Sequence, residues 1–467
     1  MKEAVFPNNL CLNKLATAPN PTASVDLINR MHSFVPILWP RSVFSTISPM
    51  SDFMIKSCAR PIFLNTSTLL NWVILFNPYK PISTPSSNIY VVFRLLNHSL
   101  LSNIQGATNA LERALAGEEL SFQDGLQLLR EENLFSLAAA ADMARNKTCG
   151  NTVTFTSSYY LNYTNVCAAS CPLCAFYRKG DEDDAYTLTI EQIVTRAGIA
   201  VKQMGAKELH IVGGFHPKLG LGYYEAMMKA IKMNYPDVTI KALTPAEIFF
   251  IAKLTRNSVK EVLLRLKDAG LDTLPGGGAE IFGAGSRGRI VRGKCSGEEW
   301  LNTVQQAHEL GLTSNSTMLF GHIEKLEDIV DHVLKIRELH KKTNGFNTFI
   351  PLKFSLDNTE LEQNGTITME SPSTYDLRII AVSRLLLSNV LNNISIYWVA
   401  LGKKLAQVAL SYGGNDLVGT AFSEEIFKAS GKGAATSIEE LINLIREVKK
   451  EPALRDSYFN IIKKFAS

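Results

Sequence analysis

From residue 159 onward, short apolar segments typical of β-strands alternate with longer amphipathic segments typical of α-helices. Strands are expected at 159–166, 208–212, 239–243, 273–274, 314–319, 348–352, 395–399 and 416–419. Helices are expected between them, for example at 190–204, 258–269, 297–310, 326–339 and 375–388. Alternation of this kind is typical of parallel βα units. Eight units predict an α/β fold, a (β/α)8 barrel of the TIM type, with its chemistry at the carboxyl ends of the strands.

An open, doubly wound sheet is the alternative architecture, and the first strand argues against it. Such a sheet would place a glycine-rich phosphate-binding turn after that strand, whereas the strand here ends in cysteines. Helices are also predicted at 110–116, 121–130, 134–146 and 438–448, the second with Ser121 as N-cap and Asp124 at the capping-box position. The predicted organisation is a helical lead-in (106–157), the barrel (158–422) and a helical C-terminal tail (423–467).

The first 105 residues differ in composition from the rest of the chain. They contain none of the 30 glycines, 10 of the 18 prolines and only three acidic residues. A folded domain usually needs glycine in some of its turns, and no helical or strand periodicity persists here. We therefore expect residues 1–105 to be a leader that contributes neither to the barrel nor to its chemistry.

Charge and hydropathy exclude several classes of protein. The chain has 467 residues, of which 46% are hydrophobic, and its 48 Lys and Arg nearly balance its 44 Asp and Glu. This balance gives no electrostatic basis for binding nucleic acid or a membrane surface. No apolar run approaches the roughly 18 residues that span a bilayer. We expect no nucleic-acid partner, no membrane span and no secretory signal peptide, and hence a cytoplasmic location.

Three of the seven cysteines, Cys167, Cys171 and Cys174, form a C-x3-C-x2-C loop at the end of the first predicted strand. Three thiolates on one short loop can bind three irons of a [4Fe–4S] cube, which leaves the fourth iron open to a small molecule. A zinc site is the alternative, but it would need a fourth ligand such as histidine. No histidine occurs between His98 and His210. We therefore predict an iron–sulfur cluster.

This loop, at this place in a barrel, resembles the radical S-adenosylmethionine (SAM) superfamily, in which the open iron binds the methionine part of SAM. Further motifs resemble the aminofutalosine synthases of the futalosine route to menaquinone. They are Cys-Ala-Phe-Tyr-Arg at 174–178, His-Ile-Val-Gly-Gly-Phe-His-Pro at 210–217, Leu-Pro-Gly-Gly-Gly-Ala-Glu-Ile-Phe at 274–282, Thr-Met-Leu-Phe-Gly-His-Ile-Glu at 317–324, Tyr-Trp-Val at 397–399 and Lys-Leu-Ala-Gln-Val-Ala-Leu at 404–410. The resemblance runs from about residue 111 to the C-terminus.

Two sister families share parts of this pattern. Dehypoxanthine futalosine cyclases resemble it at Pro-Gly-Gly-Gly-Ala-Glu but normally lack the His-Pro after the glycine pair. The radical subunit of the deazaflavin synthases shares Gly-Gly-x-His-Pro but usually has another turn in place of residues 275–278. This chain has both features, so the combination favours the aminofutalosine synthases. A catalytically silent iron–sulfur electron carrier is a further alternative.

The resemblance implies a reaction. SAM is cleaved to a 5′-deoxyadenosyl radical, which adds to the enol-ether double bond of 3-[(1-carboxyvinyl)oxy]benzoate, an aromatic dicarboxylate. Rearrangement and loss of one carboxylate as bicarbonate then give 6-amino-6-deoxyfutalosine, with methionine released. A reductant protein such as a ferredoxin or flavodoxin is expected to supply the electron.

The resemblance and the chemistry of the residues together indicate the other site residues. Gly213 and Gly214 form a turn expected to bind SAM through the backbone, and Glu280 is expected to bind the SAM ribose or ammonium, with a helix-cap role as the alternative. Phe176 and Tyr177 could pack against adenine or only cover the cluster. Candidate catalytic residues, besides Glu280, are His216, His322 and Arg287. The histidines either contact substrate and move a proton or are neutral and structural, and Arg287 is expected to bind a substrate carboxylate.

One segment departs from the family that the chain resembles. Where that family reads Ile-Pro-Leu-x-Phe-His-Pro, this chain reads Ile-Pro-Leu-Lys-Phe-Ser-Leu at 350–356. Ser355 thus replaces an imidazole at a strand end, and Lys353 precedes it by two residues. The departure touches neither the cysteines nor the glycine turns, so we expect it to alter substrate contact rather than the class of chemistry.

Overall fold

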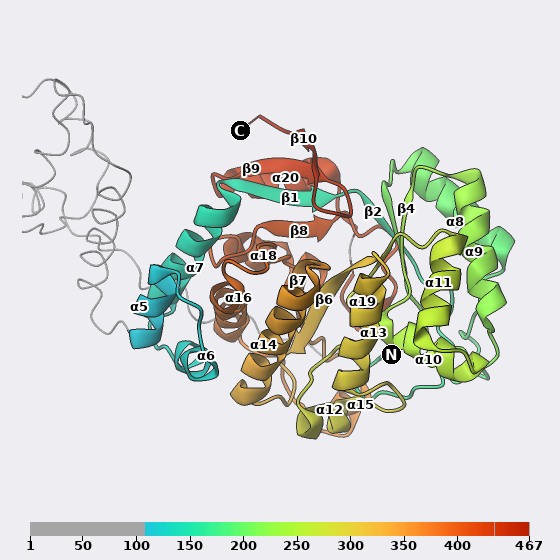
Figure 1. The fold of residues 1–467 in the computed structure, drawn as a ribbon, viewed down its shortest axis with the longest axis horizontal. Coiled ribbons are helices and arrows are strands. Elements are labelled where there is room, and N and C mark those ends of the chain that lie inside the picture. The colour runs from blue at the N-terminus through green and yellow to red at the C-terminus, as the bar shows by residue number, and fades with distance from the viewer. Residues whose placement is uncertain (1–107, 434, 467) are drawn as a thin grey trace, which may run out of the picture. The chain divides into compact units, whose positions relative to one another are not determined.

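The computed structural model describes residues 108–433 and 435–466. The predicted leader, residues 1–105, lies outside these ranges, and its role stays a prediction. Figure 1 shows parallel strands at the centre of the described part, with helices packed around them. Within the described ranges, none of the helices combines the length and the apolar character needed to cross a membrane.

The central sheet is parallel, and its six strands are joined in sequence order. They are β2 (Ser158–Leu161), β3 (Glu208–Ile211), β4 (Thr239–Ala242), β5 (Thr273–Leu274), β6 (Thr313–Phe320) and β7 (Phe346–Lys353). Each matches a strand predicted from the sequence. Because all six run in the same direction, their carboxyl ends meet at one edge of a curved half-barrel.

Local capping chemistry explains where the outer helices begin. They are α8 (Ile190–Gly198), which continues as the π-helical turn η2 (Ile199–Gln203), then α9 (Leu221–Asn234), α10 (Pro245–Thr255), α11 (Val259–Ala269), α12 (Ala284–Ile290), α13 (Gly297–Glu309), α14 (Leu326–Thr343), α15 (Glu360–Gln363) and α16 (Ser373–Leu387). Helices α8, α10, α11 and α13 each start with a Ser or Thr N-cap whose side chain accepts the N3 backbone N–H, and the N3 Gln or Glu caps in return. These are capping boxes.

The prediction of eight strands in one sheet needs correction. No strand forms at 395–399; Phe349 and Ile394 make one isolated bridge, Ser395 and Asp416 make another, and the short helix α17 (Trp398–Leu401) begins almost at once. The eighth predicted strand is β8 (Asp416–Gly419), but it belongs to a second sheet. The path from β7 back to β2 thus runs through single bridges, the last of them between Tyr159 and Phe422.

The second sheet has the order β10-β9-β1-β8 and unites the two ends of the described chain. It pairs β1 (Thr152–Thr156) with β9 (Glu451–Arg455), which in turn pairs with β10 (Ile461–Lys464). The lead-in and the tail are therefore not purely helical as predicted. After α20 (Ile438–Glu447), Lys449 adopts φ 58 and turns the chain back alongside β1.

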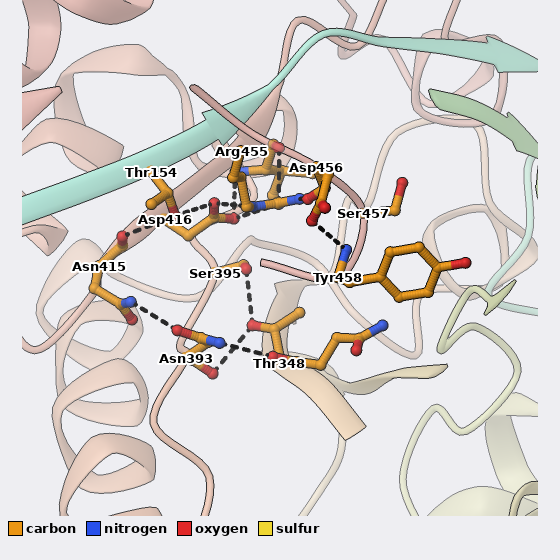
Figure 2. A network of polar contacts seen from close by, with 12 residues as sticks. Thr154, Thr348, Asn393, Ser395, Asn415, Asp416, Arg455, Asp456, Ser457 and Tyr458 are labelled. Atoms are coloured by element: carbon orange, nitrogen blue, oxygen red, sulfur yellow. Dashed lines mark hydrogen bonds and ion pairs between the residues drawn. The ribbon is translucent and has the colours of Figure 1, made fainter. Parts of the chain in front are cut away.

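A buried ion pair between Arg455 and Asp416 joins this sheet across β1 (Figure 2). Arg455 Nε donates to Asp416 Oδ1 at 2.7 Å, and a second nitrogen donates to Oδ2 at 3.0 Å. Thr154 of β1 donates to the same carboxylate at 2.7 Å. Arg455 is 3% and Asp416 0% exposed. Such a pair is stable only when both charges are present and fully hydrogen-bonded.

The lead-in helices pack on the outside of the half-barrel, as α5 (Asn109–Ala116), α6 (Phe122–Leu129) and α7 (Leu134–Cys149). Helix α7 packs against α16 and α6 against α14. The predicted capping box of Ser121 and Asp124 is present. These contacts extend the hydrophobic core beyond the sheet.

We predict that Asp416→Asn lowers the free energy of unfolding by about 3–5 kcal/mol, because it leaves the Arg455 charge buried without a counter-charge. Denaturant unfolding measures the change. As a control, Asp331→Asn removes the same charge from the exposed pair with Lys335 and should leave the midpoint nearly unchanged. Equal effects of the two variants would contradict the role given to the buried pair.

Candidate functional site

A cavity lies inside the half-barrel, and the carboxyl ends of the strands contribute to its wall. Its wall includes the three clustered cysteines, the glycine turns after β3 and β5, and residues of β6 and β7. Residues of α19 (Ile426–Ala429) also line it. Eight of the predicted site residues line it: Cys167, Cys171, Cys174, Phe176, Tyr177, Gly213, Gly214 and Glu280. The predicted residues His216, His322 and Arg287 do not.

Backbone hydrogen bonds hold the cysteine loop to the end of β3. The N–H of Cys167 donates to the carbonyl of Arg178 at 2.8 Å, and that of Ala168 to Phe215 at 2.8 Å. The N–H of Phe215 points at Cys167 Sγ at 3.2 Å, and the N–H of Arg292 at Cys171 Sγ at 3.4 Å. Hydrogen bonds to sulfur stabilise ligating thiolates and tune the potential of iron–sulfur clusters.

The thiols need positive charge nearby to ionise. Burial raises the pKa of Cys167 to about 11 and also raises that of Cys174. In both cases the ammonium of Lys294 acts in the opposite direction. Three such thiols on one loop fit a cluster, whose irons would supply the remaining positive charge.

Within the described part of the chain, no three His, Cys, Asp or Glu side chains converge as one metal ion would require. A cube needs no such convergence, because each thiolate binds a different iron. The donor set of three cavity-lining thiols, with N–H groups directed at two of them, therefore fits a [4Fe–4S] cluster.

The glycine pair after β3 is required for packing. A Cβ on Gly214 would lie 2.2 Å from the carbonyl oxygen of Val166, and one on Gly213 would lie 2.8 Å from the ring of Tyr163. The N–H of Gly213 donates to Glu247 Oε1 at 3.1 Å. The missing Cβ atoms thus let the turn pack against the cysteine loop, and the SAM contact expected of the same turn stays a prediction.

Glu280 forms an ion pair with Lys294 on the cavity wall. Lys294 Nζ lies 2.7 Å from Glu280 Oε1, and both side chains are largely buried. Burial alone would raise the pKa of Glu280, but Lys294 outweighs it and the pKa is lowered. Helix α12 begins four residues later, at Ala284, so Glu280 is not its cap.

The two aromatic residues after Cys174 lie on the wall. Phe176 is buried and meets the ring of Tyr186 edge-on, with centroids 6.5 Å apart. The turn is fixed by Arg178, which donates to the carbonyls of Ala175 and Tyr177. Both predicted roles, adenine contact and cluster cover, are compatible with this position.

Both histidines lie outside the cavity wall and make hydrogen bonds to the backbone. His216 Nδ1 accepts from the N–H of Lys218 at 3.1 Å, and the residue is half-buried. His322 is enclosed: Nδ1 accepts from Ile323 N–H at 2.7 Å, and Nε2 lies 3.1 Å from the carbonyl of Leu319. Burial lowers the pKa of both rings. Nδ1 of His322 also lies 3.0 Å from Glu324 Oε2, so both of its ring nitrogens already have partners. Its predicted substrate contact stays a prediction.

The prediction for Arg287 needs correction. All five of its N–H groups donate to backbone carbonyls, namely those of Gly278, Ala279, Ile281 and Cys295. The guanidinium is buried behind the glycine turn and has no donor left for a substrate carboxylate. Arg287 is therefore a positioning residue for the segment that carries Glu280.

Lys294 and Glu247 are among the wall residues that escaped the sequence analysis. Lys294 lies in a polar loop with no motif around it, and only the fold places it beside Glu280. Glu247 accepts from Tyr163 and from Gly213. The Thr-Pro-x-Glu capping box at 244–247 indicated a helix start here but not that the carboxylate would reach the glycine turn.

Comparison with known proteins identifies the family. The sequence pattern of the Radical SAM superfamily matches residues 161–336, and that of the CofH/MqnC C-terminal region matches residues 343–466. Aminodeoxyfutalosine synthase of Thermus thermophilus is 38% identical over 355 residues, which are 75% of this chain and 95% of that protein. This chain belongs to the radical SAM superfamily and, within it, to the CofH/MqnC family.

Relatives named for a different transferase activity are about as similar to this chain. The 5-amino-6-(D-ribitylamino)uracil–L-tyrosine 4-hydroxyphenyl transferase of Methanothermobacter thermautotrophicus is 35% identical, covering 77% of this chain and 99% of that protein. Methylornithine synthase has a similar structure, with a TM-score of 0.58 at 18% identity over 74% of this chain and 97% of that chain, which supports the fold alone. As a member of this superfamily, the radical SAM enzyme uses a [4Fe–4S] cluster and SAM.

We predict that Ala at Cys167, Cys171 or Cys174 removes most of the iron bound after anaerobic reconstitution, because two thiolates rarely retain a cube. Iron and sulfide analysis with EPR measures this. Cys149→Ala, outside the cavity, should keep the full iron content. A Cys171→Ala protein with full iron and SAM cleavage would refute the ligand assignment.

Arg287→Met should lower the free energy of unfolding by about 3 kcal/mol, because several buried carbonyls lose their donor. Arg289, exposed on the same helix, provides the control: Arg289→Met should have little effect. Denaturant unfolding compares the two. Unchanged stability with weakened substrate binding would instead restore the predicted carboxylate contact.

Proposed function

We propose that this radical SAM enzyme joins the adenosyl group of SAM to 3-[(1-carboxyvinyl)oxy]benzoate and forms 6-amino-6-deoxyfutalosine. Substrate, SAM and one water give the product, bicarbonate, methionine and one proton. The proposal is supported by relatives of that activity, among them the Thermus thermophilus enzyme at 38% identity and a Streptomyces coelicolor enzyme at 37%. We further propose a ferredoxin or flavodoxin as electron donor.

The observation that carries the proposal is the set of ordered cationic side chains in the cavity wall, which also contains carboxylates. Four cationic side chains line the same cavity as the clustered cysteines: Lys241, Lys294, Lys353 and Arg455. Each is held by a carboxylate of the protein. A dicarboxylate can compete for cations that are already placed and ordered, and ammonium groups can turn toward it without a change of fold.

The chain's own residues prepare the reaction in three ways. The cysteine loop would bind the cluster, and the Glu280–Lys294 pair offers one anion and one cation at which polar groups of SAM can be oriented. The apolar part of the wall, including Phe176, Ile350 and Leu352, excludes water. The chemistry supplied by the cluster and SAM, when bound, is a 5′-deoxyadenosyl radical.

Transfer of the 4-hydroxyphenyl part of tyrosine to 5-amino-6-(D-ribitylamino)uracil is the second candidate. It is favoured by the relatives that bear this name at 35–38% identity. By that name its substrates are tyrosine, which has a single carboxylate, and an uncharged uracil with a ribityl chain, so it would not require several cations on one wall.

We predict that the reconstituted enzyme, with dithionite and SAM under anaerobic conditions, converts the dicarboxylate to a nucleoside with the mass of 6-amino-6-deoxyfutalosine. Mass analysis of the products compares this mixture with one containing tyrosine and the ribitylaminouracil. Cys171→Ala serves as the inactive control. Product only in the second mixture would replace the proposed function by the second candidate.

A further inference from the structure

The four cations of the cavity wall differ in how many acceptors the described residues give them. Lys353 donates to a carboxylate and to a backbone carbonyl, and a second carboxylate lies 3.5 Å away. Arg455 donates to one carboxylate through two nitrogens and also to two backbone carbonyls. Lys241 and Lys294 each have one acceptor among the described residues, a single carboxylate. Because an ammonium group has three N–H donors, each of these two lysines keeps donors for a ligand.

These two lysines lie at different levels of the cavity. Lys294 is near the cysteine loop, where its charge acts on the pKa of two of the thiols. Lys241, on β4, pairs in register with His210 on β3. His210 comes four residues before Gly214, which packs against the cysteine loop, and four residues of extended chain span at most roughly 13 Å. Lys241 is therefore the deeper of the two, toward the amino ends of the strands.

An aromatic surface lies beside Lys241 in the same cross-strand row. The rings of Tyr160 and His210 stack with centroids 4.4 Å apart, and both residues line the cavity. Burial lowers the pKa of His210 to about 4, so its ring is neutral at pH 7. Burial also lowers the pKa of Lys241, and the charge of Arg455 acts in the same direction, although Glu208 opposes both. The ammonium of Lys241 is thus only partly compensated by the protein, and a second anion beside it would stabilise its charge.

We propose that Lys241 binds the ring carboxylate of the dicarboxylate substrate and thereby selects a ligand with a second anionic end. This contact rests on the proposed function. The reacting double bond and the carboxylate attached to it must lie near the cysteine loop, so the ring carboxylate, at the other end of the molecule, faces the deeper lysine. An ammonium group with unused N–H donors suits a carboxylate, and the stacked rings of Tyr160 and His210 offer the benzoate ring an aromatic surface.

The test removes the charge of Lys241 without leaving Glu208 as an unpaired buried anion. The double variant Lys241→Met with Glu208→Gln does so, and Ser457, which donates to Glu208 at 2.6 Å, can still donate to the amide oxygen. Its melting temperature should therefore stay close to that of wild type. With reconstituted enzyme under anaerobic conditions, the dissociation constant of the dicarboxylate should rise about ten- to hundredfold, as expected for loss of a hydrogen bond between charged groups. The SAM dissociation constant should stay unchanged.

Two substrate analogues identify the carboxylate that Lys241 contacts. The analogue 3-(vinyloxy)benzoate keeps only the ring carboxylate, and its dissociation constant should rise in the double variant as that of the substrate does. The analogue 2-phenoxyacrylate keeps only the carboxylate on the double bond and should bind both proteins equally. The reverse pattern would overturn the proposed contact.

A matched control and a second variant complete the test. Lys335→Met with Asp331→Asn removes an exposed ion pair outside the cavity wall and should change none of these dissociation constants. Should the double variant fail to fold, Lys241→Gln keeps a donor for Glu208 but not the charge, and it should show the same loss of affinity for the two ligands with a ring carboxylate.

The outcomes separate the contact from the proposed function. If wild type binds the dicarboxylate and the double variant binds it as tightly, the contact is overturned and the proposed function stands. If wild type does not bind the dicarboxylate at all, both are overturned. Equal loss of affinity for 2-phenoxyacrylate would show a general distortion of the cavity and would also overturn the contact. Loss of affinity for the dicarboxylate and 3-(vinyloxy)benzoate, but not for 2-phenoxyacrylate, supports it.

Discussion

A charge that leaves water must be paired, and this requirement organises the interior of the half-barrel. Four buried or largely buried ion pairs meet it: Glu208 with Lys241, Asp416 with Arg455, Glu280 with Lys294, and Asp376 with Lys353. In each pair the cation lines the cavity. In an ordinary barrel of this type, branched apolar side chains fill the same inward positions. Here paired charges line the cavity instead, and each of the four cations has a carboxylate partner.

This arrangement gives the cavity its chemical character. A charged ligand enters a site in which the cations already have partners, so binding is an exchange of partners rather than the capture of a free charge. The exchange favours a ligand whose own carboxylate takes the place of the protein carboxylate that it displaces. Near the cysteine loop, the pair that can exchange partners in this way is Glu280 and Lys294. The charge of Lys294 also acts to lower the pKa of Cys167 and of Cys174. The cysteine loop and the Glu280–Lys294 pair thus share one electrostatic environment.

The parts of the molecule that the sequence predicted are those fixed by local chemistry. Three cysteines within eight residues can only form one loop, and the Ser121–Asp124 capping box needs four consecutive residues. The six central strands follow from the alternation of apolar strands and amphipathic helices. For these features, neighbours in sequence are neighbours in space.

The features that escaped prediction depend on residues far apart in the sequence. β1 pairs with β9, about 300 residues later, and no local signal marks that partnership. The N–H groups of Arg287 donate to backbone carbonyls, and only the folded turn defines where those carbonyls point. Asn315 and Ser355 look like ordinary polar residues in the sequence, but both are buried, and Asn315 Oδ1 and Ser355 Oγ have no hydrogen-bond partner among the described residues. The strand predicted at 395–399 was lost to a helix that begins at Trp398.

The pairing of β1 between β8 and β9 also sets an order of events during synthesis. β1 leaves the ribosome long before its partners, which begin at Asp416 and Glu451. Until then both edges of β1 are unpaired, while the cysteine loop that follows it is already outside. The nascent chain therefore carries the three cysteines before the sheet beside them can close. A finished wall for the cluster exists only after β9 has been synthesised and has paired with β1, so assembly of the holoenzyme depends on a strand made long after the ligands.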